Sequence, residues 1–252
     1  MDLGLHDKVA LVTGAATGLG RAIAEVLAAE GAKVGVNYRT RPEAAQAVVN
    51  TIRAVGGTAV AVRADLTCDE EVGAMFDAVE QAFGPVEVLV NNAAFCPTAP
   101  TAELPTDTFT YTLDVNMGGT FRCCREFVGR LQAIGRAGRI VNVSSQAALR
   151  GSRSGKSAYD ASKAGVIGLT ISLSRELAAK GFRVNCVTPG LMLTEMIADA
   201  VAQDPDAFNN RVPMGRLAQT REIADVAVFL ASERASYMTG AVVDVSGGLG
   251  AH

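Results

Sequence analysis

Short apolar runs alternate with longer helical segments along this chain, and this alternation constrains the fold more than any other feature. Each run is five residues long and rich in β-branched side chains, so it is too short for a helix. Strands that are apolar on both faces need helices above and below, as in a parallel sheet. The predicted strands are Val9 to Thr13, Lys33 to Asn37, Ala59 to Arg63, Val86 to Val90, Arg139 to Val143, Arg183 to Val187 and Ala241 to Val245. The predicted helices are Gly20 to Glu30, Glu43 to Val55, Glu70 to Phe83, Phe109 to Leu131, Ala158 to Lys180 and Arg221 to Leu230.

This pattern predicts an α/β fold, a single-domain, Rossmann-type, doubly wound parallel sheet of seven strands flanked by helices. With 252 residues, of which 49% are hydrophobic, the chain can bury a core of this size. The chain has no repeat of fixed period, and its proline-rich residues 97–105 are expected to form a loop that leaves a strand. We therefore expect one domain over residues 1–252.

Composition excludes several classes of function. The chain has 23 basic and 26 acidic residues, so it offers no basic face to a nucleic-acid backbone. No apolar run approaches the roughly 20 residues of a membrane span, so we expect a cytoplasmic protein with no membrane partner. The cysteines are scattered, with no C-x-x-C pair, which favours reduced, mostly buried thiols and no metal site. They are Cys68, Cys96, Cys123, Cys124 and Cys186.

A glycine-rich turn follows the first predicted strand and opens the first predicted helix. Its residues include Gly14, Thr17, Gly18, Leu19 and Gly20, in the spacing G-x-x-x-G-x-G. Glycine permits tight backbone conformations and a close ligand approach, and a helix N-terminus presents free N–H groups to phosphate. The turn is a candidate pyrophosphate site, although ordinary strand-to-helix turns also use glycine.

Polar residues or glycines follow most of the predicted strands. Parallel sheets of this kind bind ligands outside the carboxyl ends of their strands, near the point where the strand order reverses. The combination of residue types favours a ligand site at this edge, although strand ends are often polar simply because they are loops. These residues are Gly14, Tyr38, Arg39, Asp65, Asn91, Asn92, Ser144, Ser145, Pro189 and Gly190.

The end of the second predicted strand favours NADP(H) as the cofactor. An NAD site places an acidic side chain there, whereas residues 38–41 of this chain read Tyr-Arg-Thr-Arg. An arginine fork suits a 2′-phosphate, so Arg39 and Thr40 are candidate cofactor residues. NAD(H) stays open, because these arginines are equally compatible with solvated loop charges. Asp65 is a candidate acceptor for the adenine amino group, or a cap for the helix that begins near Cys68.

Tyr159 and Lys163 stand four residues apart in a predicted helix, so they share one helix face. A free tyrosine has a pKa of about 10, and a nearby ammonium favours its phenolate, so Lys163 is expected to tune Tyr159 as an acid or base. Ser144 and Ser145 end the strand before this helix, and the sheet topology can bring a hydroxyl into the same crevice. The plainer alternatives are a half-buried tyrosine beside a solvated lysine, and serines that only form a turn.

Together these motifs resemble those of the short-chain dehydrogenase/reductase family over nearly the whole chain, with a general similarity to 3-oxoacyl-carrier-protein reductases. Taken together, these motifs are highly specific to that family. They are TGAATGLG at 13–20, DL at 65–66, NNAA at 91–94, VNMGGT around Asn116, IVNVSS at 140–145, YDASK at 159–163, PG at 189–190 with a following Thr194, and the C-terminal TGAVVDVSGG.

The resemblance assigns catalytic roles to four residues. Tyr159 is implied as the proton donor or acceptor, Lys163 as the residue that holds the nicotinamide ribose and lowers the tyrosine pKa, and Ser145 as the residue that positions the substrate carbonyl. Asn116 is implied to support a proton relay; beside two glycines it is poor helix material, which otherwise indicates a tolerated kink. The implied cofactor residues are Gly14, Thr17, Gly18, Leu19, Gly20, Arg39, Thr40, Asp65, Leu66, Asn91, Ala93, Tyr159, Lys163, Pro189, Gly190 and Thr194.

Two departures from the family pattern bear on the site. Ala94 stands where the family usually has glycine, so an extra methyl group is expected near the cofactor. Ser145 lies one residue further from Tyr159 than is commonest in the family, which leaves Ser144 as an alternative catalytic serine.

The implied reaction is hydride transfer between a nicotinamide and a carbonyl or secondary alcohol, with a ketone or 3-oxoacyl compound as the expected substrate. The alternative is a redox-inactive dinucleotide sensor, which loss of the catalytic side chains would favour. A homotetramer docked through Ala164, Gly165 and Gly168 is also implied, unless these small residues pack against the sheet.

Substrate identity depends on three expected loops, at residues 95–104, 146–156 and about 191–212. Arg150, Arg153 and Lys156 point to an acidic or carrier-linked substrate or, more simply, to solvated loop charges.

Overall fold

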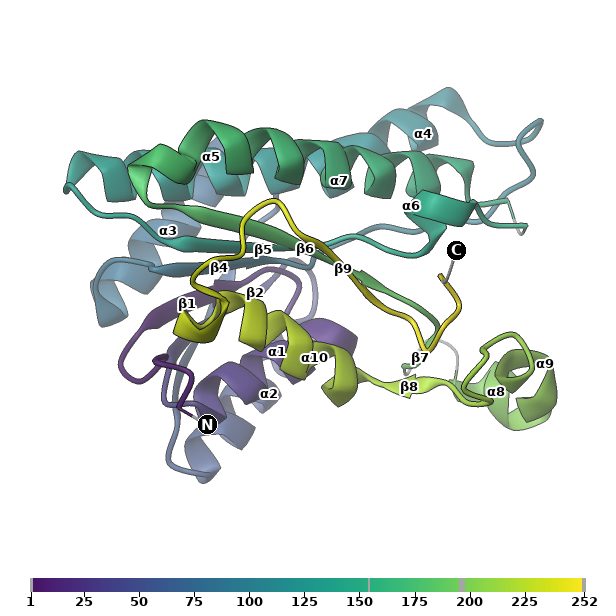
Figure 1. Ribbon diagram of the computed structural model, residues 1–252, viewed down its shortest axis with the longest axis horizontal. Coiled ribbons are helices and arrows are strands. Elements are labelled where there is room, and N and C mark those ends of the chain that lie inside the picture. Colours follow the sequence, from purple (N-terminus) through teal and green to yellow (C-terminus); the bar gives the residue numbers. More distant parts are fainter. Residues whose placement is uncertain (1, 154, 195–197, 251–252) are drawn as a thin grey trace.

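A parallel sheet covered by helices on both faces forms the centre of the computed structural model, in which residues 2–153, 155–194 and 198–250 are described (Figure 1). The strand order is β3-β2-β1-β4-β5-β6-β9, and every pairing in this sheet is parallel. The order reverses between β1 and β4, as a doubly wound fold requires. The strands are β1 (Val9–Val12), β2 (Lys33–Tyr38), β3 (Thr58–Arg63), β4 (Val88–Asn91), β5 (Arg139–Val143), β6 (Arg183–Pro189) and β9 (Val242–Val245). The predicted seven-stranded α/β fold is confirmed.

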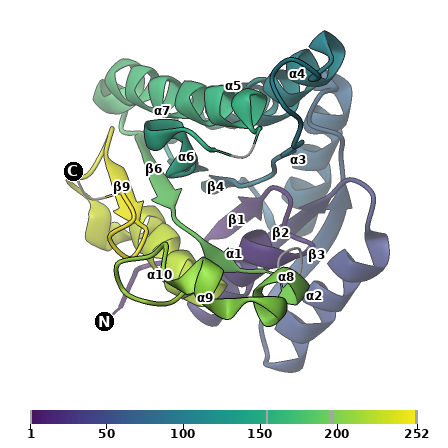
Figure 2. The ribbon, with the colours of Figure 1, turned by 90° about the vertical axis from the view of Figure 1, so that its right-hand side faces the viewer.

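The helices form two layers, one on each face of the sheet (Figures 1 and 2). One layer contains α1 (Gly18–Ala29), α2 (Pro42–Ala54) and α10 (Thr220–Ala231). The other contains α3 (Asp69–Phe83), α4 (Thr106–Leu113), α5 (Gly119–Ala133) and α7 (Ser157–Leu177). Short 3-10 helices follow α7 and α10 as η2 (Ala178–Lys180) and η3 (Glu233–Ala235).

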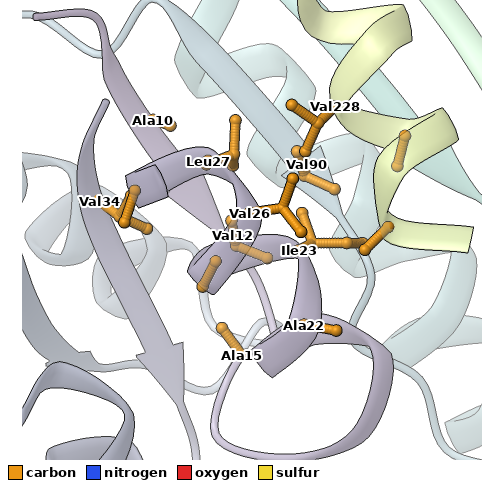
Figure 3. Packing of buried hydrophobic residues seen from close by; sticks show 14 of the residues in the cluster. Ala10, Val12, Ala15, Ala22, Ile23, Val26, Leu27, Val34, Val90 and Val228 are labelled. Atoms are coloured by element: carbon orange, nitrogen blue, oxygen red, sulfur yellow. The ribbon is translucent and has the colours of Figure 1, made fainter. Parts of the chain in front are cut away.

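Each layer buries its own hydrophobic core against the sheet. Alternate residues of β1 divide between the two cores, because successive side chains of a strand point to opposite faces. Val12 packs with Ile23 of α1 and Val228 of α10 in one core, which is drawn in Figure 3. Leu11 belongs to the other core, with Phe76 of α3. Burial of both faces explains why the strands are apolar throughout.

The single helix predicted for residues 109–131 is wrong in one respect. The structure has α4, then a π-helix, η1 (Asp114–Gly118), and only then α5. Asn116 lies inside η1, so the poor helix material noted in the sequence marks a change of helix type and not a simple kink.

Several short elements at the carboxyl edge of the sheet were not predicted. Figure 2 looks onto this edge. The segment 191–212, expected as a loop, contains short elements, and its residues 195–197 lie outside the described residues. The unpredicted elements are α6 (Ala147–Arg150), β7 (Met192–Leu193), α8 (Ala198–Gln203), α9 (Pro205–Asn209) and β8 (Ala218–Gln219), which pairs with β7.

The cysteines are free thiols in this fold. Cys123, Cys124 and Cys186 are buried, Cys68 is half-buried, and Cys96 is exposed in the loop after β4. Burial raises the pKa of the Cys124 thiol to about 12. In the part of the chain that is described, no helix is both long enough and apolar enough to cross a membrane.

Candidate active site and cofactor site

The turn between β1 and α1 has the backbone that its glycines predicted. Gly14 and Gly18 adopt φ values of 60° and 57°, in the left-handed region that favours glycine. A Cβ added at Gly20 would lie 2.4 Å from the Gly14 carbonyl oxygen, so no side chain fits there. Thr17 is the N-cap of α1 but makes no side-chain capping bond, and the first turn carries no acidic residue. The N-terminus of α1 is therefore free to receive an anion.

Three polar residues hold this turn in place. Asn37 Oδ1 accepts a hydrogen bond from Gly14 N at 3.1 Å, and Asn92 Nδ2 donates to the Thr13 and Gly14 carbonyls at 3.0 and 3.1 Å. Thr13 Oγ1 accepts from the backbone N–H groups of Asn92 and Ala93. Sequence reasoning assigned no role to Asn37; the signal was a polar residue at the end of an otherwise apolar strand.

A cavity of about 360 Å³ opens beside this turn. It runs along the carboxyl ends of β1 to β4, where a doubly wound sheet binds a dinucleotide. Most of the residues predicted for the adenosine half of a cofactor line it, whereas Tyr159 and Lys163 do not. The lining residues are Gly14, Ala16, Thr17, Asn37, Tyr38, Arg39, Thr40, Arg41, Ala64, Asp65, Leu66, Asn92, Ala93, Ala94, Phe95 and Val115.

Arg39 is tethered at the side of this cavity. Its guanidinium lies 3.7 Å from Asp65 Oδ2 and donates a hydrogen bond to the Tyr111 hydroxyl. Burial acts to raise the pKa of Asp65, but hydrogen bonds from Thr67 and the charge of Arg39 lower it below its ordinary value. The Asp65 carboxylate accepts hydrogen bonds from Thr67 and so caps that turn. It does not cap helix α3, whose N-cap is Cys68.

Asn91 presents a buried side-chain oxygen that has no hydrogen-bond partner among the described residues. Its side-chain Nδ2 donates to Cys124 Sγ at 3.3 Å and to Asn142 Oδ1 at 2.9 Å, while no described group donates to its Oδ1. Such an acceptor costs about 1–3 kcal/mol unless something pairs with it. A ligand hydroxyl would satisfy it, so the residue fits its expected role in binding a cofactor.

Tyr159, Lys163 and Ser145 converge at the end of β5. Lys163 is buried, donates to the Val143 carbonyl at 2.7 Å, and has its Nζ 5.8 Å from the centre of the Tyr159 ring. The Ser145 hydroxyl is close enough to the Tyr159 phenol to act on its pKa. Ser144 instead donates to the Lys163 carbonyl at 2.7 Å. Ser145 faces the tyrosine, whereas Ser144 fastens β5 to α7.

The pKa values of these groups differ from the expectation. Burial raises the pKa of Tyr159 to about 12, and the nearby Cys96 adds to the rise, although the hydrogen bond with Ser145 opposes it. Burial lowers the pKa of Lys163 to about 8. The pKa of Tyr159 is therefore raised where a lowering by Lys163 was expected, because loss of solvation dominates and Lys163 is not among the groups that shift it.

Asn116 is fully buried, and its side chain is committed to the surrounding scaffold. Oδ1 accepts from Phe95 N at 2.7 Å, while Nδ2 donates to Phe95 O at 2.9 Å and to Ser162 Oγ at 2.8 Å. The Asn116 carbonyl accepts from Thr120 Oγ1 at 2.7 Å. The π-helix thus fastens the loop after β4 to helix α7, next to Tyr159.

Gln146 joins the candidate catalytic serine to the C-terminal part of the sheet. The residue is buried, and its Nε2 donates to Thr188 Oγ1 at 3.2 Å and to the Asp244 carboxylate. Its backbone N–H donates to the Pro189 carbonyl at 3.0 Å. Gly190 packs so closely here that a Cβ would lie 2.7 Å from Ser246 Cα. Sequence reasoning placed Gln146 only at the start of the expected substrate loop, residues 146–156, and not in this network.

The remaining predicted cofactor residues differ in burial and in whether they line the cavity. The side chains of Leu19 and Leu66 belong to the two hydrophobic cores, and Leu66 also lines the cavity. Thr194 is half-buried and follows β7. Ala94 is exposed and lines the cavity, so its extra methyl group stands where the sequence placed it.

The loop that follows α6 folds back onto helix α7. Asp160 accepts from Ser152 N at 2.6 Å and from Ser152 Oγ at 2.9 Å. Arg150 donates to the Leu249 carbonyl, so one of the three expected substrate cations is engaged with the chain itself. Ser154, in the same loop, lies outside the described residues.

The chain is similar to known proteins over nearly its whole length. Residues 14–250 match the family model described as "Enoyl-(Acyl carrier protein) reductase". The chain is 44% identical over 244 residues to the uncharacterized oxidoreductase YgfF of Escherichia coli, covering 95% of this chain and 99% of that protein. It is 40% identical over 243 residues to the 3-oxoacyl-[acyl-carrier-protein] reductase FabG of Staphylococcus aureus, covering 96% and 98%. A crystal structure from Agrobacterium tumefaciens, provisionally titled a gluconate dehydrogenase, superposes with a TM-score of 0.93 at 32% identity, covering 100% and 99%.

Proposed function

Because the chain belongs to the short-chain dehydrogenase/reductase family and is an NAD(P)-dependent oxidoreductase of carbonyl and alcohol groups, we propose that it reduces a 3-oxoacyl thioester or a related ketone with NADPH. One observation carries the proposal. The Tyr159 phenol, the Ser145 hydroxyl and the Lys163 ammonium meet at the carboxyl edge of the sheet, on the side of β4 away from the adenosine cavity. The name of the FabG relative supports the thioester substrate class.

The proton chemistry follows from the surroundings of Tyr159. With a pKa of about 12, the phenol carries its proton at neutral pH, as a general acid for carbonyl reduction must. The neighbouring Ser145 hydroxyl would donate to the same developing alkoxide oxygen. A bound NADPH supplies the hydride. Lys163 keeps a positive charge beside the phenol below pH of about 8, and this charge stabilises the phenolate that remains after the proton has left.

The cofactor side is built from residues of the first half of the sheet. We assign the pyrophosphate to the N-terminus of α1 and a ribose hydroxyl to the buried Asn91 oxygen, which has no partner in the described part of the chain. Arg39 and Thr40 line the part of the cavity nearest the end of β2, where a 2′-phosphate is expected. Arg39 supports NADPH over NADH, because a guanidinium pairs with the phosphate that only NADPH carries.

The first experiment follows the absorbance of NADPH and NADH during incubation with an acetoacetyl thioester and a panel of ketones. We expect turnover with NADPH and its loss in Tyr159→Phe, a variant that keeps the ring but removes the proton. Retention of turnover in this variant would contradict the assignment of the general acid. Tight NADPH binding without turnover of any substrate would instead favour the alternative of a dinucleotide sensor.

Arg39→Ala tests the cofactor preference. Loss of one charge-assisted contact of about 1.5–3 kcal/mol should raise the KM for NADPH by about 10- to 100-fold and leave the KM for NADH nearly unchanged. Arg221→Ala is the matched control, because Arg221 pairs with Asp225 on the exposed side of α10. Equal effects of Arg39→Ala on both cofactors would refute the NADPH preference.

We also propose a homotetramer. Ala164 and Gly168 of α7 are exposed and do not pack against the sheet, while Gly165 packs against Met117 of η1. Phe121, with 46% of its surface exposed, and Ile171, with 41%, flank them on α5 and α7. Covering this face with a second copy would bury these apolar side chains.

We further propose the cytoplasm as the location of the protein. We also propose that residues 1–252 form one domain, in which the 191–212 segment contacts substrate.

A further inference from the structure

The hydroxyl of Ser162 lies between two parts of the candidate active site. Ser162 is fully buried on α7, one residue before Lys163. Its Oγ accepts a hydrogen bond from Asn116 Nδ2 at 2.8 Å and donates one to the Tyr159 carbonyl at 2.7 Å. The hydroxyl therefore connects the side chain of one candidate catalytic residue with the backbone of another.

The Asn116 side chain donates two hydrogen bonds and accepts one in this arrangement. Two of the three join Asn116 to the backbone of Phe95, in the loop after β4. The third, to Ser162, is the one that reaches helix α7. Within the described residues, Ser162 is thus the side-chain link between the π-helix and the helical turn that carries Tyr159.

We propose that Ser162 is a positioning residue for the reaction, an inference that rests on the proposed function. It acts through Asn116 and the Tyr159 carbonyl by holding the first turn of α7 at a set distance from η1 and from the Phe95 loop. The phenol then keeps its place beside Ser145. Ser162 itself is assigned no contact with substrate or cofactor.

Other hydroxyl groups on α7 show what an ordinary helix contact looks like. Ser174 Oγ donates to the Ile171 carbonyl at 2.8 Å, three residues back, as Ser162 does to Tyr159. Bonds of this kind are common for serine within helices and serve the helix alone. The bond that Ser162 accepts from Asn116 distinguishes it from Ser174, which is equally buried but lies three turns away from the site.

Removal of the Ser162 hydroxyl leaves an Asn116 N–H without a partner in a dry environment. The helix turn and η1 can then move apart, and displacements of about 1 Å in an active site cost up to about 100-fold in rate. For Ser162→Ala we expect a kcat lower by about 10-fold, within this range, and an unchanged Kd for NADPH, because the cofactor cavity contains neither residue.

The test compares Ser162→Ala with Ser174→Ala, which removes the same atom from the same helix. Five forms are assayed for NADPH-dependent reduction of the acetoacetyl thioester: wild type, Ser162→Ala, Ser174→Ala, Asn116→Ala and the double variant that combines Ser162→Ala with Asn116→Ala. The Kd for NADPH is measured by fluorescence and the fold by circular dichroism. Crystal structures of wild type and of both serine variants give a readout that does not depend on turnover.

Three results support the proposal. Ser162→Ala lowers kcat while Ser174→Ala does not, the double variant is no slower than Asn116→Ala, and the Tyr159 hydroxyl is displaced from Ser145 only in Ser162→Ala. Equal kcat values for the two serine variants, or multiplying losses in the double variant, would overturn it. So would an unmoved Tyr159 in the Ser162→Ala crystal structure. If the wild type reduces no substrate, the proposed function fails, and the crystal structures alone decide the position of Tyr159.

Discussion

Lys163 is buried and Tyr159 is half-buried, and the loss of solvation favours the neutral form of each. The pKa of Tyr159 rises to about 12 and that of Lys163 falls to about 8. At neutral pH the tyrosine is therefore an acid with its proton in place, and the lysine is cationic but close to losing its charge. This pair is suited to reduction near neutral pH, whereas oxidation of an alcohol requires the scarce phenolate.

These shifts predict opposite pH dependences for the two directions. Because kcat/KM reports groups of the free enzyme, its value for reduction should be constant below pH of about 8 and fall above it, as Lys163 loses its proton. Alcohol oxidation requires the phenolate of Tyr159. Its kcat/KM should therefore rise with pH at values well below 12, because Tyr159 ionises only near that pH. The measurement is a pH profile of kcat/KM in each direction. A reduction profile that stays level up to pH of about 10 would contradict the role of the Lys163 charge.

At the scale of elements, the glycine-rich turn and helix α1 are adapted to each other. The close approach at Gly20 involves the backbone carbonyl of Gly14 and the side chain of Asn92, and a backbone atom cannot move without deforming the turn. The requirement for glycine at this position is thus steric. It is independent of the positive φ values at Gly14 and Gly18.

We predict that Gly20→Ala weakens NADPH binding by at least about 10-fold and lowers the free energy of unfolding by about 1–3 kcal/mol, the usual cost of overpacking. Gly73→Ala is the control, since Gly73 lies in helix α3 and a Cβ there meets nothing within 4 Å. That variant should be more stable by about 0.5–1 kcal/mol and bind NADPH normally. Isothermal titration and thermal melts measure both quantities. Normal cofactor binding by Gly20→Ala would show that the turn adapts.

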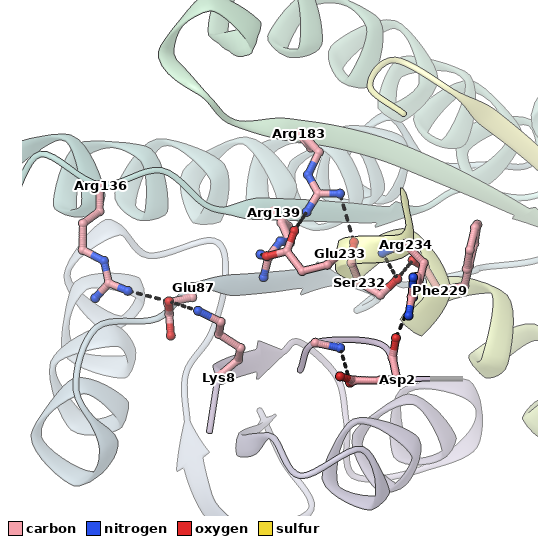
Figure 4. A network of polar contacts seen from close by, with 11 residues as sticks. Asp2, Lys8, Glu87, Arg136, Arg139, Arg183, Phe229, Ser232, Glu233 and Arg234 are labelled. Carbon is pink, nitrogen blue, oxygen red and sulfur yellow. Dashed lines mark hydrogen bonds and ion pairs between the residues drawn. The ribbon is translucent and has the colours of Figure 1, made fainter. Parts of the chain in front are cut away.

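At the scale of the whole molecule, ionic contacts at the amino ends of the strands join elements that are distant in sequence (Figure 4). Glu233 of η3 accepts from Arg139 at the start of β5 and from Arg183 at the start of β6. Burial lowers the pKa of Arg183, and the neighbouring charge of Arg139 adds to this effect, while Glu233 opposes it. The Glu233 backbone also donates to the Leu3 carbonyl at 2.9 Å, so the N-terminal segment is held to the same point.

Glu233→Gln should therefore destabilise the protein without changing its chemistry. The variant leaves two largely buried guanidinium groups beside each other, but because Glu233 is itself half exposed we expect a loss of only about 1–2 kcal/mol, or about 2–8 °C in Tm. The kcat should be unchanged, since the network lies at the edge of the sheet opposite the site.

Asp225→Asn is the matched control for this variant. It breaks a pair with Arg221 on α10 in which both side chains are more than half exposed, and such pairs contribute about 0–1 kcal/mol. Thermal and urea unfolding of both variants measure the difference. Equal stability of the two variants would mean that Glu233 contributes no more than an ordinary surface charge.

The sequence by itself determined the fold class and most of the element positions. Periodicity is a local property, so five-residue apolar runs and amphipathic segments identified the strands and helices that build the sheet. The residue types of the candidate site, such as Tyr159 four residues before Lys163, were equally visible, because a helix places such pairs on one face. The π-helix η1 was not visible in the sequence, because it depends on hydrogen bonds from Asn116 to Phe95 and Ser162.

Only the tertiary structure decided how these residues act on one another. It placed Ser145 rather than Ser144 against Tyr159, and it gave Ser162 and Gln146 partners that lie tens of residues away along the chain. It also reversed the expected direction of the Tyr159 pKa shift. The physical reason is the same in each case: solvation and hydrogen-bond partners depend on which atoms surround a group in space, and local sequence patterns carry no information about those neighbours.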